Sequence, residues 1–136
     1  MEKYRLDKDI KVMCVTADSF PEGIQAAHKK LHNCGPFSKD KGYFGLSYPD
    51  KGLIIYKAAI EEIEVGEAEK RGLKTFVIGK GNYISTLLPD YLKDLSAIPK
   101  VFAELTSYPG IDPHGVCIEW YLNGGKDMRC MVRLDD

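Results

Sequence analysis

The fold of this chain is decided by residues 115–132, which read "GVCIEWYLNGGKDMRCMV". Two apolar, alternating runs flank Asn123-Gly124, and an Asn-Gly pair between such runs is the strongest short-range signal for a β-hairpin. Glu119 lies inside the first run, between an isoleucine and a tryptophan, where a charged residue is usually disfavoured. What this carboxylate meets is therefore the main question about function.

Alternation along the first run separates its side chains into two faces, because successive strand residues point to opposite sides of a sheet. Glu119 and Tyr121 share one face. On the residues alone, this face is expected to be turned to solvent, since charged side chains are mostly exposed. The other face is expected to pack against helices, and its members are Val116, Ile118, Trp120 and Leu122.

Similar patterns extend outward from this hairpin and repeat in the first half of the chain. Aromatic and β-branched runs on both sides of a Pro-Asp-Lys-Gly turn predict another hairpin. Apolar residues at helical spacing predict two helices, with Ser19 and Ser96 as candidate N-caps. The expected elements are a strand at 10–17, a helix at 19–34, strands at 43–49 and 53–63, a solvated connection at 64–72, a strand with a Gly-rich bulge at 73–88, a helix at about 97–108, and strands at 114–122 and 127–134.

The order strand, helix, strand, strand thus occurs twice, without residue-level identity between the halves. We expect an α+β fold in one domain, residues 1–136, with modules at about 8–65 and 72–135. Antiparallel hairpins would form the sheet, and two helices would cover part of it.

Composition excludes several classes of function. The 136 residues carry a formal net charge of −1 with no basic block, so no direct contact with nucleic acid is expected. No leader-like segment and no apolar stretch near the roughly 20 residues needed to span a bilayer is seen, so we expect a cytoplasmic protein that does not contact membranes. The four cysteines form no CxxC pair and are expected to be reduced and structural.

Two short motifs have the residue types of a metal site and of a phosphate-binding loop. His28 and His32 have i, i+4 spacing with Cys34 nearby, which can hold zinc, but such polar pairs are common on helix surfaces. "GKGNY" (79–83) contains a GxG without the third glycine of a phosphate-binding loop. Neither a metal nor a cofactor is predicted.

"CIEWYL" (117–122), "YFGLSYPDKGLIIYKAAIEE" (43–62) and the doubled element order resemble the GyrI-like small-molecule-binding domain, the effector-binding domain of bacterial transcription regulators. The resemblance covers about residues 10–134. It implies two strand–helix–strand–strand modules packed about a pseudo-twofold axis, a curved antiparallel sheet with two helices, and a ligand groove between the modules.

The resemblance also implies the site. Glu119 matches a strand glutamate that faces planar organic cations among aromatic rings, Tyr121 matches its accompanying tyrosine, and Tyr56 matches a tyrosine of the first module. Two further residues are expected in the groove on strand pattern alone: Tyr83, and Glu62, which alternation places on the face of Tyr56.

Regulators of this family carry a helix-turn-helix segment before the effector domain, whereas about nine residues precede the first predicted strand here. We therefore expect a bacterial stand-alone member, monomeric or dimeric, that binds a small aromatic or cationic organic molecule and is linked to transcription regulation or drug resistance. Two alternatives stay open: a hydrolase of cyclopropane-bearing alkylators that uses Glu119 and Tyr121, and a partner of a topoisomerase, of gyrase-inhibitor type.

Overall fold

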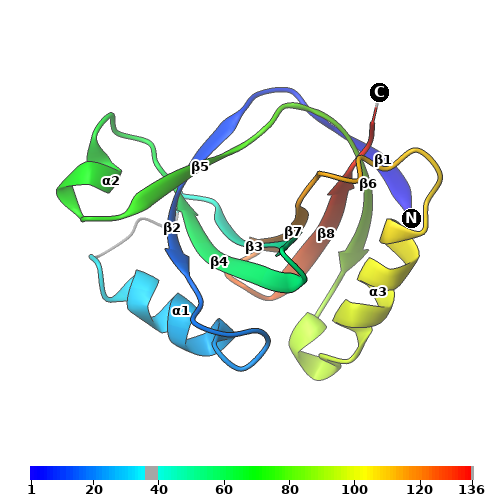
Figure 1. The fold of residues 1–136 in the computed structure, drawn as a ribbon, viewed down its shortest axis with the longest axis horizontal. Coiled ribbons are helices and arrows are strands. Elements are labelled where there is room, and N and C mark those ends of the chain that lie inside the picture. The colour runs from blue at the N-terminus through cyan, green and yellow to red at the C-terminus, as the bar shows by residue number, and fades with distance from the viewer. Residues whose placement is uncertain (36–39, 136) are drawn as a thin grey trace.

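The computed structural model describes residues 1–35 and 40–135, and shows an α+β fold (Figure 1). An eight-stranded antiparallel sheet is accompanied by α-helices on its outer side. The elements in chain order are β1 (Glu2–Leu6), β2 (Ile10–Thr16), α1 (Ile24–His32), β3 (Tyr43–Asp50), β4 (Leu53–Glu61), α2 (Glu67–Lys70), β5 (Lys74–Ile78), β6 (Gly81–Leu88), the 3-10 helix η1 (Tyr91–Lys93), α3 (Ala97–Thr106), β7 (Cys117–Leu122) and β8 (Asp127–Arg133).

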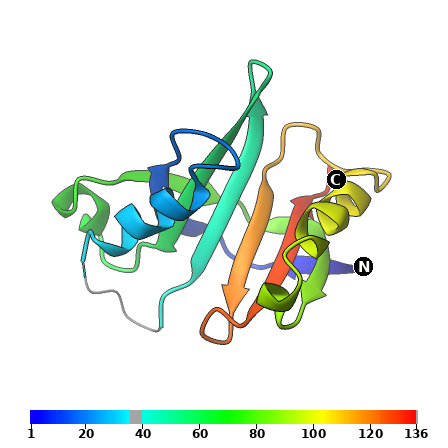
Figure 2. The same cartoon turned by 90° about the horizontal axis from the view of Figure 1, so that it is seen from below.

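The strand order is β1-β6-β8-β7-β3-β4-β2-β5, and it places β7 and β3 at the centre. Reading outward from the centre gives β3, β4, β2, β5 on one side and β7, β8, β6, β1 on the other, so the two halves are arranged alike. Helices α1 and α3 lie on the same side of the sheet, one over each half (Figures 1 and 2). The predicted α+β class, with a curved antiparallel sheet and covering helices, is confirmed.

The opening hairpin forms as its sequence predicts. Strands β7 and β8 pair antiparallel from Leu122 and Asp127 outward. In the turn between them, Asn123 and Gly124 have φ values of 55° and 70°, a left-handed conformation that this residue pair tolerates well.

The two halves exchange their leading strands, which the sequence pattern did not reveal. Strand β1 precedes β2 in the chain but pairs with β6, and β5 precedes β6 but pairs with β2. The run at 73–88, expected to be one bulged strand, is therefore two strands on opposite sides of the sheet centre. Residues 79–80 separate the two strands, and Gly81, the first residue of β6, has a φ of +143°, which favours glycine.

Both faces of the sheet are buried, and this corrects one expectation. The face without helices buries a core made of strand side chains, in which Ile118 is fully buried and Trp120 packs with its ring centroid 5.4 Å from that of Phe44. The opposite face, which carries Tyr121 and Cys117, packs on α3. The expectation that Ile118 and Trp120 face the helices is wrong, because the curled sheet encloses a core of its own on that side.

The charged segment at 64–72 is also less solvated than expected. It contains α2, and the Glu67 side chain is buried between Lys41 and Arg71, whose Nε lies 3.5 Å from Glu67 Oε2. In the described part of the chain no helix is long and apolar enough to cross a membrane.

Candidate functional site: a carboxylate beside an aromatic groove

The central strands set opposite residues side by side: Gly45 on β3 faces Glu119 on β7, and Tyr43 faces Tyr121. Next to this pair lies a groove of about 930 Å³ between α1 and η1. We call it the α1–η1 groove. Its lining residues are His28, His32, Asp40, Lys41, Gly42, Tyr43, Glu61, Tyr91, Trp120, Tyr121, Leu122, Asn123, Gly124 and Gly125.

Glu119 is held by two tyrosine hydroxyls. Tyr56 on β4 and Tyr121 on β7 donate to the same oxygen, Glu119 Oε1, at 2.8 and 3.0 Å. Among the described residues Oε2 accepts no hydrogen bond, and Glu67 Oε1 is the one fully buried side-chain oxygen or nitrogen there that lacks a partner. Glu119 Oε2 is therefore an unused acceptor that is not sealed from solvent.

Gly45 makes room for this arrangement. A Cβ at position 45 would collide with the Tyr56 hydroxyl and with Glu119 Oε1. The absence of a side chain on β3 lets the carboxylate and the phenol meet over the backbone, since glycine is the residue that permits such close approach.

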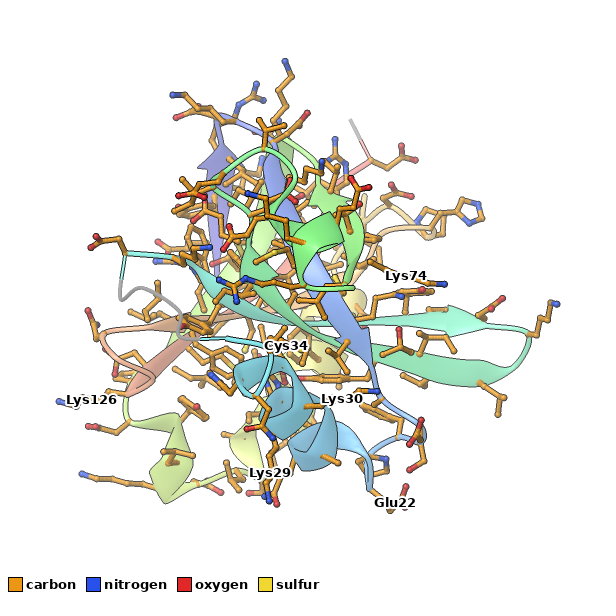
Figure 3. The ribbon with its side chains drawn as sticks, turned by 90° about the vertical axis from the view of Figure 1, so that its left-hand side faces the viewer. Glu22, Lys29, Lys30, Cys34, Lys74 and Lys126 are labelled. Carbon is orange, nitrogen blue, oxygen red and sulfur yellow. The ribbon has the colours of Figure 1, made fainter. Side chains whose placement is uncertain are left out.

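Among the described residues, no cation pairs with the carboxylate to offset its charge. Burial raises the pKa of Glu119, while the hydrogen bonds from Tyr56 and Tyr121 act in the opposite direction. The ion pairs within the described ranges do not include Glu119, and the basic residues Lys29 and Lys30 of α1 are exposed on the helix surface (Figure 3). The two tyrosine hydrogen bonds therefore offset only part of the cost of burying the negative charge of Glu119.

His28 completes the hydrogen-bond cluster from the helix side. Its Nε2 lies 2.8 Å from the Tyr56 hydroxyl and 3.4 Å from that of Tyr121. Burial, with a smaller contribution from the charge of His32, lowers the pKa of His28 to about 4, so the ring is neutral at neutral pH. Across the described ranges no group of three potential metal ligands comes together, and the i, i+4 histidines do not form one.

Aromatic rings surround the acid. Tyr91 from η1 lies 5.9 Å from Tyr121 between ring centroids, and burial and then the charge of Glu119 raise its pKa. On the other side, Phe20 stacks on Tyr56 at 6.1 Å and keeps 42% of its surface exposed.

Sequence reasoning missed three members of this cluster. His28 was considered only as a zinc ligand, although its helical spacing from the apolar positions Ile24 and Leu31 already placed it facing the sheet. Tyr91 and Phe20 lie in segments outside the regular strands and helices, where periodicity gives no direction.

Two predicted site residues are placed elsewhere. Tyr83 is buried in the strand-only core, and its hydroxyl donates to the Gly79 carbonyl at 2.5 Å. Glu62 pairs with Lys11 at 3.1 Å and accepts a hydrogen bond from the Ala68 amide at 2.9 Å. The structure thus brings Glu119, Tyr121 and Tyr56 together and does not bring Tyr83 or Glu62 to them.

Comparison with known proteins found related folds. No protein-family model matches the chain, and no curated protein matches it. An integron cassette protein from the mobile metagenome of Vibrio cholerae has a TM-score of 0.69 and 9% identity, over 98% of this chain and 94% of that one. The protein SAV2435, solved bound to tetraphenylphosphonium, has a TM-score of 0.68 and 12% identity, over 98% and 92%.

A third structure, from Staphylococcus aureus and described as a bacterial transcription regulation protein, has a TM-score of 0.60 and 12% identity over 97% of both chains. These neighbours are consistent with the resemblance to GyrI-like domains. At such identities they show a shared fold alone.

Proposed function

We propose that this protein binds a lipophilic organic cation in the α1–η1 groove, with Glu119 supplying the opposite charge. One observation carries the proposal: a partly buried carboxylate, bonded by Tyr56 and Tyr121 through Oε1, has an open Oε2 and no cationic partner in the described structure.

The energetics favour such a ligand. A carboxylate withdrawn from water loses solvation that a cation would restore, and the surrounding rings of Tyr121, Tyr91 and His28 offer apolar area. Each tyrosine face near a cation adds roughly 0.5–2 kcal/mol, depending on how far it is desolvated. A flat or globular aromatic cation would use both the charge and the rings.

The neighbouring structures support the proposal. A protein of this fold has been solved with tetraphenylphosphonium, which is a lipophilic cation, and another is described in terms of transcription regulation. We infer that the ligand acts as an effector or as a sequestered drug, so the protein would serve regulation or resistance without contacting DNA itself.

Glu119→Gln tests the charge directly. The substitution keeps the shape and removes the negative charge, so affinity for tetraphenylphosphonium should fall by roughly 1–3 kcal/mol. Isothermal titration calorimetry would measure it. Glu61→Gln is the matched control, because Glu61 lines the same groove but bonds to the Gly42 amide, at 3.1 Å. Equal affinity of Glu119→Gln and wild type would refute the proposal.

Hydrolysis in the same groove is the second candidate, favoured by one observation. Burial moves the pKa of Glu119 upward, which suits a general base near neutral pH, and Oε2 is free to accept a proton from water. Tyr121 would then hold the carboxylate in place. Turnover of a cyclopropane-bearing alkylator by wild type, and its loss in Glu119→Gln, would establish hydrolysis; binding without turnover would exclude it for that substrate.

A further inference from the structure

His28 has contacts that the proposed function does not yet use. Its Nε2 lies 2.8 Å from the Tyr56 hydroxyl, and that hydroxyl lies 2.8 Å from Glu119 Oε1. The imidazole also meets the rings of Tyr56 and Tyr121 edge-on, at centroid distances of 5.8 and 5.6 Å. The side chain is thus fixed against both tyrosines that bond to the acid.

Counting protons fixes the direction of these hydrogen bonds. Each tyrosine hydroxyl carries one proton, and an ionised carboxylate can only accept. If Tyr56 and Tyr121 both donate to Oε1, the short contact between Tyr56 and His28 is a hydrogen bond only when Nε2 carries a proton. A neutral ring in that state has an unprotonated Nδ1.

The opposite tautomer would weaken the site. With Nε2 unprotonated, the Tyr56 hydroxyl would face two acceptors and could turn its proton toward the imidazole. Glu119 Oε1 would then keep one donor, from Tyr121, and the carboxylate would lose part of the stabilisation that keeps it ionised.

We propose that His28 is a positioning residue for cation selection: the N–H at its Nε2 donates to the Tyr56 hydroxyl, keeps both tyrosine protons on Glu119 Oε1, and leaves Oε2 as the open acceptor for the ligand's positive charge. This role rests on the proposed function and names the group that gives the site its preference for charge. Where the carboxyl is protonated before binding, its proton leaves to solvent as the cation enters, so charge is conserved.

Other titratable groups share the groove with His28 and could affect its pH behaviour. Those in the groove lining are His32 from α1, Tyr43 from β3, Tyr91 from η1, Tyr121 from β7, and Asp40, Lys41 and Glu61. Tyr56 from β4 and Glu119 from β7 lie beside the groove and belong to the hydrogen-bond cluster. Among them, those within hydrogen-bond distance of Nε2 are Tyr56 and Tyr121. We therefore attribute the effect of His28 on cation preference to its contacts with Tyr56 and Tyr121, and not to the charged residues elsewhere in the groove lining.

Two probes of similar shape separate charge from packing. Tetraphenylphosphonium carries a permanent positive charge, and triphenylphosphine oxide is uncharged. His28→Phe removes the donor and keeps a ring, whereas His28→Gln keeps an N–H donor. Gln25→Ala is the control, because Gln25 is an exposed, uncharged residue of the same helix, α1.

His28→Phe should weaken tetraphenylphosphonium binding about tenfold or more, because hydrogen bonds that support a charged group are the strong ones, while binding of the uncharged probe changes less than about twofold. His28→Gln and the control should stay within about threefold of wild type for both probes. An equal loss for both probes, an unchanged cation affinity in His28→Phe, or a His28→Gln variant as weak as His28→Phe would each overturn the positioning role.

A measurement without ligand keeps this inference separate from the proposed function. Nitrogen-15 NMR of the imidazole, above the pH range in which Glu119 titrates, should show the proton on Nε2. A proton on Nδ1 alone would overturn the role of His28, whatever the probes do. Failure of the wild-type protein to bind tetraphenylphosphonium would instead refute the proposed function, while the NMR result still decides the tautomer.

Discussion

Gly45 and Glu119 form the residue pair on which the site depends. They lie opposite each other on the two central strands, and the space that a side chain at 45 would fill is taken by the Tyr56 hydroxyl and the carboxylate. A residue without a side chain therefore contributes to the site as much as the charged one, because it sets how closely the phenol and the acid can approach.

Gly45→Ala should disrupt this cluster. The new methyl group would push the Tyr56 hydroxyl away from Glu119, so we expect a loss of about 1–3 kcal/mol in the free energy of unfolding and weaker cation binding. Urea denaturation and calorimetric titration would measure the two effects. Adding Tyr56→Phe should recover part of the stability, since it removes the nearest clashing atom. An unperturbed single variant would contradict the geometry.

The sequence located part of this cluster for definite reasons. Glu119 and Tyr121 share a face because they are two apart on one strand, so alternation alone unites them. Tyr56 came from the family resemblance. Helical spacing puts His28 on the face of α1 that packs on the sheet, but its tyrosine partners are 28 and 93 residues away in the chain, so no local pattern indicates the contact.

At the scale of elements, the exchanged leading strands are the least predictable feature. Strand β1 is five residues long and mostly polar, so it gives little strand signal. The Gly-rich break at 79–81 fits a bulge as well as a change of direction. Alternation also divides a strand into two faces without indicating which face the helices cover. For this reason the expectation that Trp120 packs against the helices is wrong.

Tyr4→Ala tests whether β1 stabilises the second half. Tyr4 meets Trp120 edge-on at 6.2 Å, and the Arg129 guanidinium lies 4.7 Å above the Tyr4 ring. Losing both contacts should cost about 2–4 kcal/mol of unfolding free energy.

Fluorescence can report this change, because Trp120 is the single tryptophan of the chain. Its emission should shift to the red in Tyr4→Ala, because the edge-on ring contact that helps to shield the indole is lost. Lys3→Ala, on an exposed neighbouring residue, is the control. A stability loss as large in the control would point to general weakening of β1.

At the scale of the whole molecule, the free energy of unfolding depends on pH through His28, which lines the groove. The pKa of His28 is lowered in the folded state to about 4 from an ordinary 6.5. Between about pH 4 and pH 6.5, the imidazole is therefore protonated in the unfolded chain and neutral in the folded protein. The contribution of His28 to stability is therefore present above about pH 6.5 and is lost as the pH falls toward 4. Glu119 acts with the opposite sign, because its raised pKa favours the protonated, folded form at acid pH.

A comparison of wild type with His28→Gln separates the effect of His28 on stability from that of Glu119. As the pH falls through this window, wild type should lose up to about 3 kcal/mol of unfolding free energy more than the variant does. Urea denaturation at a series of pH values would measure this difference. Parallel curves for the two proteins would mean that His28 titrates alike in the folded and unfolded states.

The exchange of β1 and β5 also governs the order in which the chain can fold as it leaves the ribosome. Strand β1 emerges first, but it can pair only after its partner β6, which begins at Gly81, has been synthesised. The central pairing of β3 with β7 comes later still, with residues 117–121. A product that ends before residue 117 therefore lacks the proposed site, and a ligand of that site can stabilise only molecules in which β7 has been synthesised.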